Sequence, residues 1–356
     1  MSEVYYAPGK RSDSNRETTR KVDVLWEAAR LGDCFGRLDL TAIKLHVGEP
    51  GKTTFVRPVV ARALVERLRI VGARPFLTDT CVLYKSPRNN GVGHARVASN
   101  HGFSIEQTGA PFLPADGLSG EEEVEMEAGG KHFKTVSIAA GIARARSMLV
   151  LSHATGHLAT GFGGALKNVG MGCATRKAKL RMHFGRQPDI SPDLCDGCGE
   201  CAAACPEEAI AIDGTAAIDM DRCIGCGACV ARCVRDAVAF DWTVSGIELQ
   251  ERIVEHAAAV IRARPKKIVY VTSATSITKD CDCLGSPQEP VCEDIGILAS
   301  WDPVAIDDAI LRMIEERSGK TLESMTYPLH DARAQIRYAV KMGLGRPASK
   351  IINVGG

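Results

Sequence analysis

The chain of 356 residues contains no long apolar segment and no apolar stretch near its start. No run approaches the roughly 18 apolar residues that indicate a membrane-spanning helix. The polar start MSEVYYAPGKRSDSNRETTR lacks the apolar core of a signal peptide. The formal net charge of +1 gives no basic excess of the kind that favours nucleic acid or anionic membranes. These absences predict a cytoplasmic globular protein that binds neither nucleic acid nor membrane.

Two common nucleotide-binding patterns are also missing. No G-x-G-x-x-G follows a predicted strand, so a nicotinamide or flavin site of the Rossmann type is not indicated. The segment HVGEPGKT (46–53) resembles the end of a phosphate-binding loop, but His46 stands where that motif requires glycine, and Pro50 stiffens the loop. The next helix is expected only near Pro58, so we predict no nucleoside triphosphate site here.

Cysteine, in contrast, is abundant. Without an export signal the 14 cysteines do not indicate a disulfide framework, because the cytosol keeps thiols reduced. Metal ligation or redox chemistry is the first expectation. Six cysteines are scattered, and eight lie within 39 residues, at Cys195, Cys198, Cys201, Cys205, Cys223, Cys226, Cys229 and Cys233.

The eight cysteines form an internal repeat. CDGCGECAAACPEEAIAID (195–213) and CIGCGACVARCVRDAVAFD (223–241) are identical at 10 of 19 positions. In each copy, C-x2-C-x2-C-x3-C places three thiolates on one [4Fe–4S] cluster and directs the fourth to the neighbouring cluster. One cluster is thus assigned to Cys195, Cys198, Cys201 and Cys233, and the other to Cys223, Cys226, Cys229 and Cys205. Four glycines suit loops that approach the clusters closely, namely Gly197, Gly199, Gly225 and Gly227.

This repeat resembles the bacterial two-cluster ferredoxin family over about 50 residues. Pro206 follows the fourth cysteine of the first motif, as in that family, but Val234 replaces the proline in the second. Zinc is the alternative, although a zinc site favours four ligands in two separated pairs. We therefore predict two [4Fe–4S] clusters as cofactors.

On both sides of the repeat, apolar strands alternate with amphipathic helices. Strands are predicted at 41–48, 75–80, 147–153, 267–273 and 294–300, and helices at 58–70, 247–264 and from Asp302 to Gly319. The predicted fold is an α/β domain with a mainly parallel sheet, interrupted by an α+β two-cluster ferredoxin-like module. Residues 1–188 and 242–356 form the two parts of the α/β domain, and residues 189–241 form the inserted module.

Charge is divided unevenly between these parts. Residues 189–241 contain 11 acidic and 3 basic side chains, whereas 128–188 contains ten lysines and arginines and no acid. Such a basic stretch is usually a solvated face. Here we expect it either to dock the acidic module or to bind an anionic substrate.

The segment that follows the 147–153 strand holds the main candidate site. Ligand sites of open α/β sheets gather at the carboxyl ends of strands. Residues 153–183 supply the glycine-rich turn Gly161–Gly164 and the candidate catalytic residues His153, His157, Lys167 and His183. Taken singly, each of these is more often structural; as a group they indicate a pocket for an anion or a metal.

A second candidate is KDCDCLG (279–285), which follows the 267–273 strand. Cys281 and Cys283 either bind a further metal, act as redox thiols, or are idle. Because both segments follow strands of one sheet, we expect Cys281 and Cys283 to join the histidines and Lys167 in one active site.

Several longer phrases carry a resemblance to a known family. AIKLHVGE, LTDTCVLY, SHATGH, GFGGALKNVGMG, CDC and DIGILASWDPVAID, in this order around the double cysteine motif, resemble the iron–sulfur members of the domain of unknown function 362 family. The resemblance covers about residues 40 to 318; Cys292 and the first 40 residues lie outside the family pattern. It implies cluster binding and no particular substrate.

The leading functional hypothesis is an iron–sulfur oxidoreductase that passes electrons from a redox partner protein to a small anionic or metal-bound substrate in the α/β domain. Two alternatives stay open: a non-enzymatic electron carrier, and an accessory protein that matures a metal centre in another enzyme.

Overall fold

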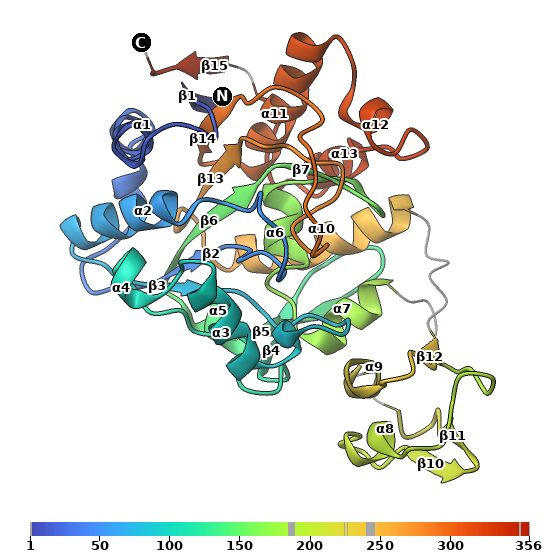
Figure 1. The fold of residues 1–356 in the computed structure, drawn as a ribbon. Coiled ribbons are helices and arrows are strands. Elements are labelled where there is room, and N and C mark those ends of the chain that lie inside the picture. Colours follow the sequence, from blue (N-terminus) through green and yellow to red (C-terminus); the bar gives the residue numbers. More distant parts are fainter. Residues whose placement is uncertain are drawn as a thin grey trace.

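The computed structural model describes residues 2–183, 189–223, 225, 227–239, 246–348 and 350–355. Its centre is a seven-stranded sheet in the order β15-β1-β14-β13-β6-β2-β3 (Figure 1). The strands are β1 (Glu3–Pro8), β2 (Leu40–Lys44), β3 (Arg74–Thr78), β6 (Ser147–His153), β13 (Ile268–Ala274), β14 (Gly296–Ser300) and β15 (Lys350–Asn353).

The sheet is mainly parallel. Strands β13, β6, β2 and β3 run parallel to one another, and β1 runs parallel to β15. Only β14 is antiparallel to both of its neighbours, β1 and β13. The predicted α/β class with a mainly parallel sheet is therefore confirmed.

Helices cover both faces of the sheet, which explains why its central strands are apolar throughout. Successive side chains of β6 alternate between two cores: Met148 and Val150 belong to one, Leu149 and Leu151 to the other. Helices α1 (Asn15–Ala28) and α2 (Pro58–Ile70) cover one face, and α6 (Ala165–Gly170), α10 (Gly246–Arg262) and α11 (Pro303–Ser318) cover the other (Figure 1).

The helix boundaries follow local sequence signals. Helix α2 begins at Pro58, as predicted, so no helix starts at Lys52 in the loop that resembles a phosphate-binding loop. Helix α11 begins where the Asp302 carboxylate accepts the N–H groups of Val304 and Ala305, and it ends at Gly319 with a φ of 66°.

The remaining elements are shorter. Outside residues 189–239, the helices are α3 (Gly91–Asn100), α4 (Ile105–Thr108), α5 (Ala140–Arg144), α7 (Arg176–His183), α12 (Leu322–Met325) and α13 (Ala334–Lys341). Two small antiparallel pairs join β4 (Glu123–Glu127) to β5 (Thr135–Ala139) and β7 (Thr155–His157) to β8 (Gly161–Gly163). In the described part of the chain, no helix is long and apolar enough to cross a membrane.

Residues 189–239, the cysteine-rich segment, form elements and a small apolar core of their own (Figure 1). Strand β9 (Asp189–Ile190) pairs with β12 (Val238–Ala239), and β10 (Ile210–Asp213) with β11 (Thr215–Ile218). The helices are α8 (Glu200–Ala203) and α9 (Ala228–Arg232). The two ends of the segment are thus neighbours, while strands before and after it share the central sheet. The predicted limits at 188 and 241 lie outside the described residues.

Candidate functional site

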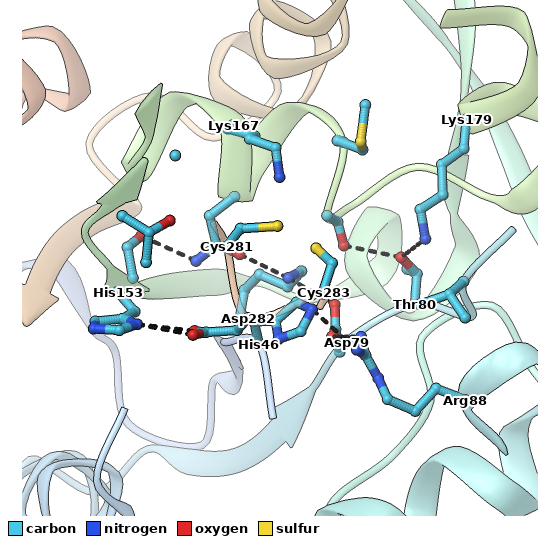
Figure 2. A pocket seen from close by; sticks show the side chains of 18 of the residues that line it. His46, Asp79, Thr80, Arg88, His153, Lys167, Lys179, Cys281, Asp282 and Cys283 are labelled. Atoms are coloured by element: carbon cyan, nitrogen blue, oxygen red, sulfur yellow. Dashed lines mark hydrogen bonds and ion pairs between the residues drawn. The ribbon is translucent and has the colours of Figure 1, made fainter. Parts of the chain in front are cut away.

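A pocket of about 140 Å³ opens at the carboxyl ends of β2, β3 and β6 and beside the loop after β13. This is the edge where ligands bind in open α/β sheets. The lining includes five of the predicted residues, namely His153, Lys167, His183, Cys281 and Cys283. The two cysteine side chains and Lys167 point into the same space (Figure 2).

The sixth predicted residue, His157, is not among the lining side chains. Its Nδ1 atom accepts the N–H groups of Ala159 and Thr160, both at 3.1 Å, in the turn between β7 and β8. Burial, and then the charge of Lys167, hold the pKa of His157 well below its ordinary value. His157 is therefore neutral and fixes the turn beside the pocket.

The two thiols interact directly. A hydrogen bond from the Cys281 thiol holds the pKa of Cys283 well below its ordinary value; burial opposes this effect, and the Lys167 ammonium and His46 add to it. The same hydrogen bond, with burial, raises the pKa of Cys281. The shared hydrogen bond therefore makes Cys283 the more acidic thiol of the pair and Cys281 the less acidic one.

His153 and Asp282 hold this loop in place. The His153 Nδ1 atom lies 3.0 Å from each oxygen of the Asp282 carboxylate (Figure 2). Its Nε2 atom lies 2.8 Å from the Thr275 carbonyl oxygen. Although burial acts in the opposite direction, His153 lowers the pKa of Asp282. Because both ring nitrogens are occupied, we interpret His153 as a positioning residue.

Sequence reasoning missed a buried ion network in the lining of the pocket. Asp79, just after β3, accepts from Lys44 at 2.8 Å and from Arg88 at 3.2 Å, and Arg88 also donates to Glu49 at 3.0 Å. His46 lies 3.0 Å from Arg88. Lys44, His46 and Asp79 lie near the carboxyl ends of the strands predicted at 41–48 and 75–80. Because ligand sites gather at such strand ends, the predicted strands could have indicated these residues.

The lysines of the pocket differ in their partners. Lys179 donates to the Thr80 hydroxyl at 2.7 Å (Figure 2). Lys44 donates to the Asn168 side-chain oxygen at 2.7 Å. Within the residues that the structure describes, no hydrogen bond or ion pair holds the Lys167 ammonium, whose pKa is raised by Cys283 and Cys281 against the effect of burial. Burial lowers the pKa of His183 to about 4. Lys167 is therefore the charged group that best suits an anionic ligand.

The cysteines of the repeat surround two separate small cavities. Cys195, Cys198, Cys201 and Cys233 line one, together with Gly197 and Gly199. Cys205, Cys223 and Cys229 line the other, together with Gly225 and Gly227; Cys226 lies outside the described residues. The fourth cysteine of each motif thus lines the cavity of the other motif, and the assignment of these cysteines to clusters stays a prediction.

Backbone groups are directed at several of these sulfurs. The N–H groups of Ala216, Ala209 and Ala237 donate to the Sγ atoms of Cys195, Cys205 and Cys233 at 3.2 to 3.3 Å. Among the residues described, no three His, Cys, Asp or Glu side chains converge on a position for a single metal ion.

Comparison with known proteins identifies the family of this chain. Residues 41–312 match the model of a family described as domain of unknown function (DUF362). The chain belongs to the DUF362 family. No curated protein matches it.

Two solved structures resemble this DUF362 chain. The lactate racemase apoprotein from Thermoanaerobacterium thermosaccharolyticum aligns with a TM-score of 0.38 and 10% identity over 77% of this chain and 51% of its own. A structural genomics target from Thermotoga maritima aligns with a TM-score of 0.39 and 12% identity over 90% of this chain and 61% of its own. The DUF362 chain thus spans about half to three fifths of the length of these proteins.

The second cysteine motif of the DUF362 chain contacts the pocket wall. A Cβ atom placed on Gly227 would lie 2.5 Å from Cδ1 of Leu83, and one on Gly225 would lie 3.6 Å from Cδ2 of Leu180. Leu83 lines the pocket, and Leu180 belongs to α7, within the stretch that lacks acidic residues. Leu83 therefore contacts both the second motif and the pocket.

Proposed function

We propose that this protein is an iron–sulfur oxidoreductase in which electrons from a redox partner protein pass through two [4Fe–4S] clusters to a small anionic substrate in the pocket. The observation that carries the proposal is the position of Leu83, which both lines the pocket and contacts Gly227 of the second motif.

The residues of the cysteine-rich segment fit such clusters. Each cubane takes four thiolates, and the four cysteines around the first cavity are the four assigned to one cluster. The three cysteines described at the second cavity belong to the other set. The N–H groups directed at Cys195, Cys205 and Cys233 would stabilise thiolate charge. When bound, the clusters supply single electrons.

Within the pocket, the residues of the chain divide the remaining tasks. Lys167 binds the anionic group of the substrate, because its ammonium faces the pocket without a partner among the described residues. Of the two thiols, Cys281 has the raised pKa and suits a proton donor, and Cys283 has the lowered pKa and suits a thiolate. His153 and Asp282 keep the two sulfurs in position.

The cluster assignment is tested with paired variants. Anaerobically prepared protein is expected to contain eight irons and eight sulfides, as two [4Fe–4S] clusters require. Cys205→Ser should lose the cluster of the second motif, and Cys233→Ser that of the first, each with about half of the iron. Zinc as the main metal would contradict the proposal.

The same variants test whether the second cluster lies beside the pocket. Lys167→Glu replaces a positive charge by a negative one and should lower the potential of a nearby cluster, because the reduced form carries more negative charge. We expect this shift in Cys233→Ser, which retains the second cluster, and a smaller one in Cys205→Ser. Equal shifts in the two backgrounds would argue against electron delivery through the second motif.

A further inference from the structure

Three hydrogen bonds, one within the loop and two from other segments, hold the loop that carries Cys281 and Cys283. The N–H group of Leu284 donates to the Cys281 carbonyl oxygen at 3.1 Å, which closes a turn around the pair. The N–H group of Glu49 donates to the Asp282 carbonyl oxygen at 2.9 Å, and the Tyr84 hydroxyl donates to the Cys283 carbonyl oxygen at 3.2 Å. The backbone therefore keeps the two sulfurs together in the pocket (Figure 2).

These thiols differ from four of the scattered cysteines. Burial raises the pKa of Cys34 and Cys81 to about 12 and that of Cys173 and Cys292 to about 11, which disfavours their thiolate forms. Cys283 has the opposite shift, and unlike those four cysteines it lines the pocket. A thiolate that is accessible and hydrogen-bonded to a second thiol is the usual environment of a redox-active cysteine pair.

We propose that Cys281 and Cys283 form a reversible disulfide that serves as a two-electron store between the single-electron clusters and the substrate. In the reductive direction the S–S bond breaks, two electrons enter one at a time, Cys281 takes up one proton, and Cys283 remains a thiolate beside Lys167. The oxidative direction returns two electrons and one proton to a two-electron acceptor in the pocket. The delivery of electrons by the clusters rests on the proposed function, whereas the formation of the disulfide does not depend on it.

The charge around the pair favours its reduced form. The Lys167 ammonium stabilises the Cys283 thiolate, and a stabilised reduced form makes a disulfide easier to reduce. His153 contributes indirectly, because it anchors Asp282 between the two cysteines. The disulfide is therefore suited to accept electrons from a weak reductant, and the reduced pair is suited to transfer two electrons to the substrate.

The disulfide is tested in the cluster-loaded protein. After anaerobic treatment with the thiol oxidant diamide, free thiols are alkylated and the peptide that contains Cys281 and Cys283 is analysed by mass spectrometry. We expect this peptide to lose the mass of two hydrogens and to escape alkylation. Cys281→Ser and Cys283→Ser should abolish this change, whereas Cys292→Ser, a nearby cysteine outside the pocket, should retain it. An unchanged, fully alkylated peptide in the wild-type protein would overturn the inference.

A second measurement separates this inference from the proposed function. The oxidised protein is mixed with reduced viologen, a one-electron donor, and reopening of the disulfide is followed over time. We expect reopening to be at least tenfold slower in Cys205→Ser than in the wild type, while dithiothreitol reopens both equally. If the disulfide forms but viologen reopens it at the same rate in both proteins, the inference stands and delivery through the second motif is wrong.

Discussion

At the scale of single residues, Lys167 adds to the effect of the Cys281 hydrogen bond on the reactivity of Cys283. Its ammonium lowers the pKa of Cys283, so its removal should raise that pKa and reduce the thiolate fraction at neutral pH. We predict that Lys167→Met slows alkylation of Cys283 by iodoacetamide several-fold at pH 7, with the difference vanishing at high pH, where both proteins are fully ionised. The pH profile of the alkylation rate measures this effect.

Lys177→Met provides the matched control. Lys177 also lies in the stretch without acidic residues, but it pairs with Glu123 at 3.3 Å and does not line the pocket. Its replacement should leave the alkylation profile unchanged. A profile that shifts equally in both variants would show that general charge, rather than the position of Lys167, activates the thiol.

Sequence reasoning found part of this site and missed another part for a physical reason. His153, Lys167 and Cys281 could be grouped because they follow predicted strands and belong to residue types with evident chemistry. Arg88 was missed because its burial depends on Asp79 and Glu49, which contact it only in the folded chain. No local pattern distinguishes such an arginine from a solvated one.

At the scale of secondary-structure elements, two glycines at the same position of the two cysteine motifs allow the contact between the second motif and Leu83 to be tested. Gly199 and Gly227 precede α8 and α9 with φ values of 78° and 72°, so alanine at either position costs about 1 to 2 kcal/mol of backbone strain. A Cβ atom on Gly227 would also overlap Leu83, whereas one on Gly199 would meet nothing within 4 Å.

We therefore predict that Gly227→Ala is more disruptive than Gly199→Ala. Hydrogen exchange should accelerate in α9 and around Leu83 in the first variant and only near α8 in the second. Adding Leu83→Ala to Gly227→Ala removes the overlapping side chain and should return exchange toward the level expected from backbone strain alone. Similar exchange in the two single variants, with no effect of Leu83→Ala, would contradict the contact between the second motif and the pocket wall.

Secondary-structure elements with strong local signals were predictable, and those defined by distant partners were not. Helix α2 and strand β6 have the predicted bounds because proline position and an apolar run mark them locally. Strands β1 and β15 were not predicted: β1 pairs with β14, almost 300 residues away, and with β15 near the other end of the chain. Their pairing depends on chain topology, which local patterns do not encode.

At the scale of the whole molecule, the two parts of the chain outside the cysteine-rich segment contribute strands to the same central sheet. Strand β6 lies before the segment and β13 after it, and the two pair in parallel from Ile268 and Met148 to Ser273 and His153. The repeat of cysteines with a constant pitch made a separate unit visible in the sequence. The division into domains remains a prediction that deletion of the segment can test.

We predict that the protein folds without residues 189–239. Asp189 and Ala239 are register partners in the β9–β12 pair, so the two ends of the deleted segment are neighbours, which favours tolerance of the deletion. The deletion variant should bind no iron, and it should still unfold cooperatively because the central sheet and both of its apolar cores lie outside the segment.

Two further measurements examine the deletion variant. The alkylation rate of Cys283 should rise over the same pH range as in the full chain, since the groups that lower the pKa of Cys283 also lie outside the segment. Exposure of Leu83 and Leu180 at the vacated contact should favour self-association, which sedimentation would detect. Loss of cooperative unfolding in calorimetry would mean that the segment is an integral part of the α/β domain rather than an insertion into it.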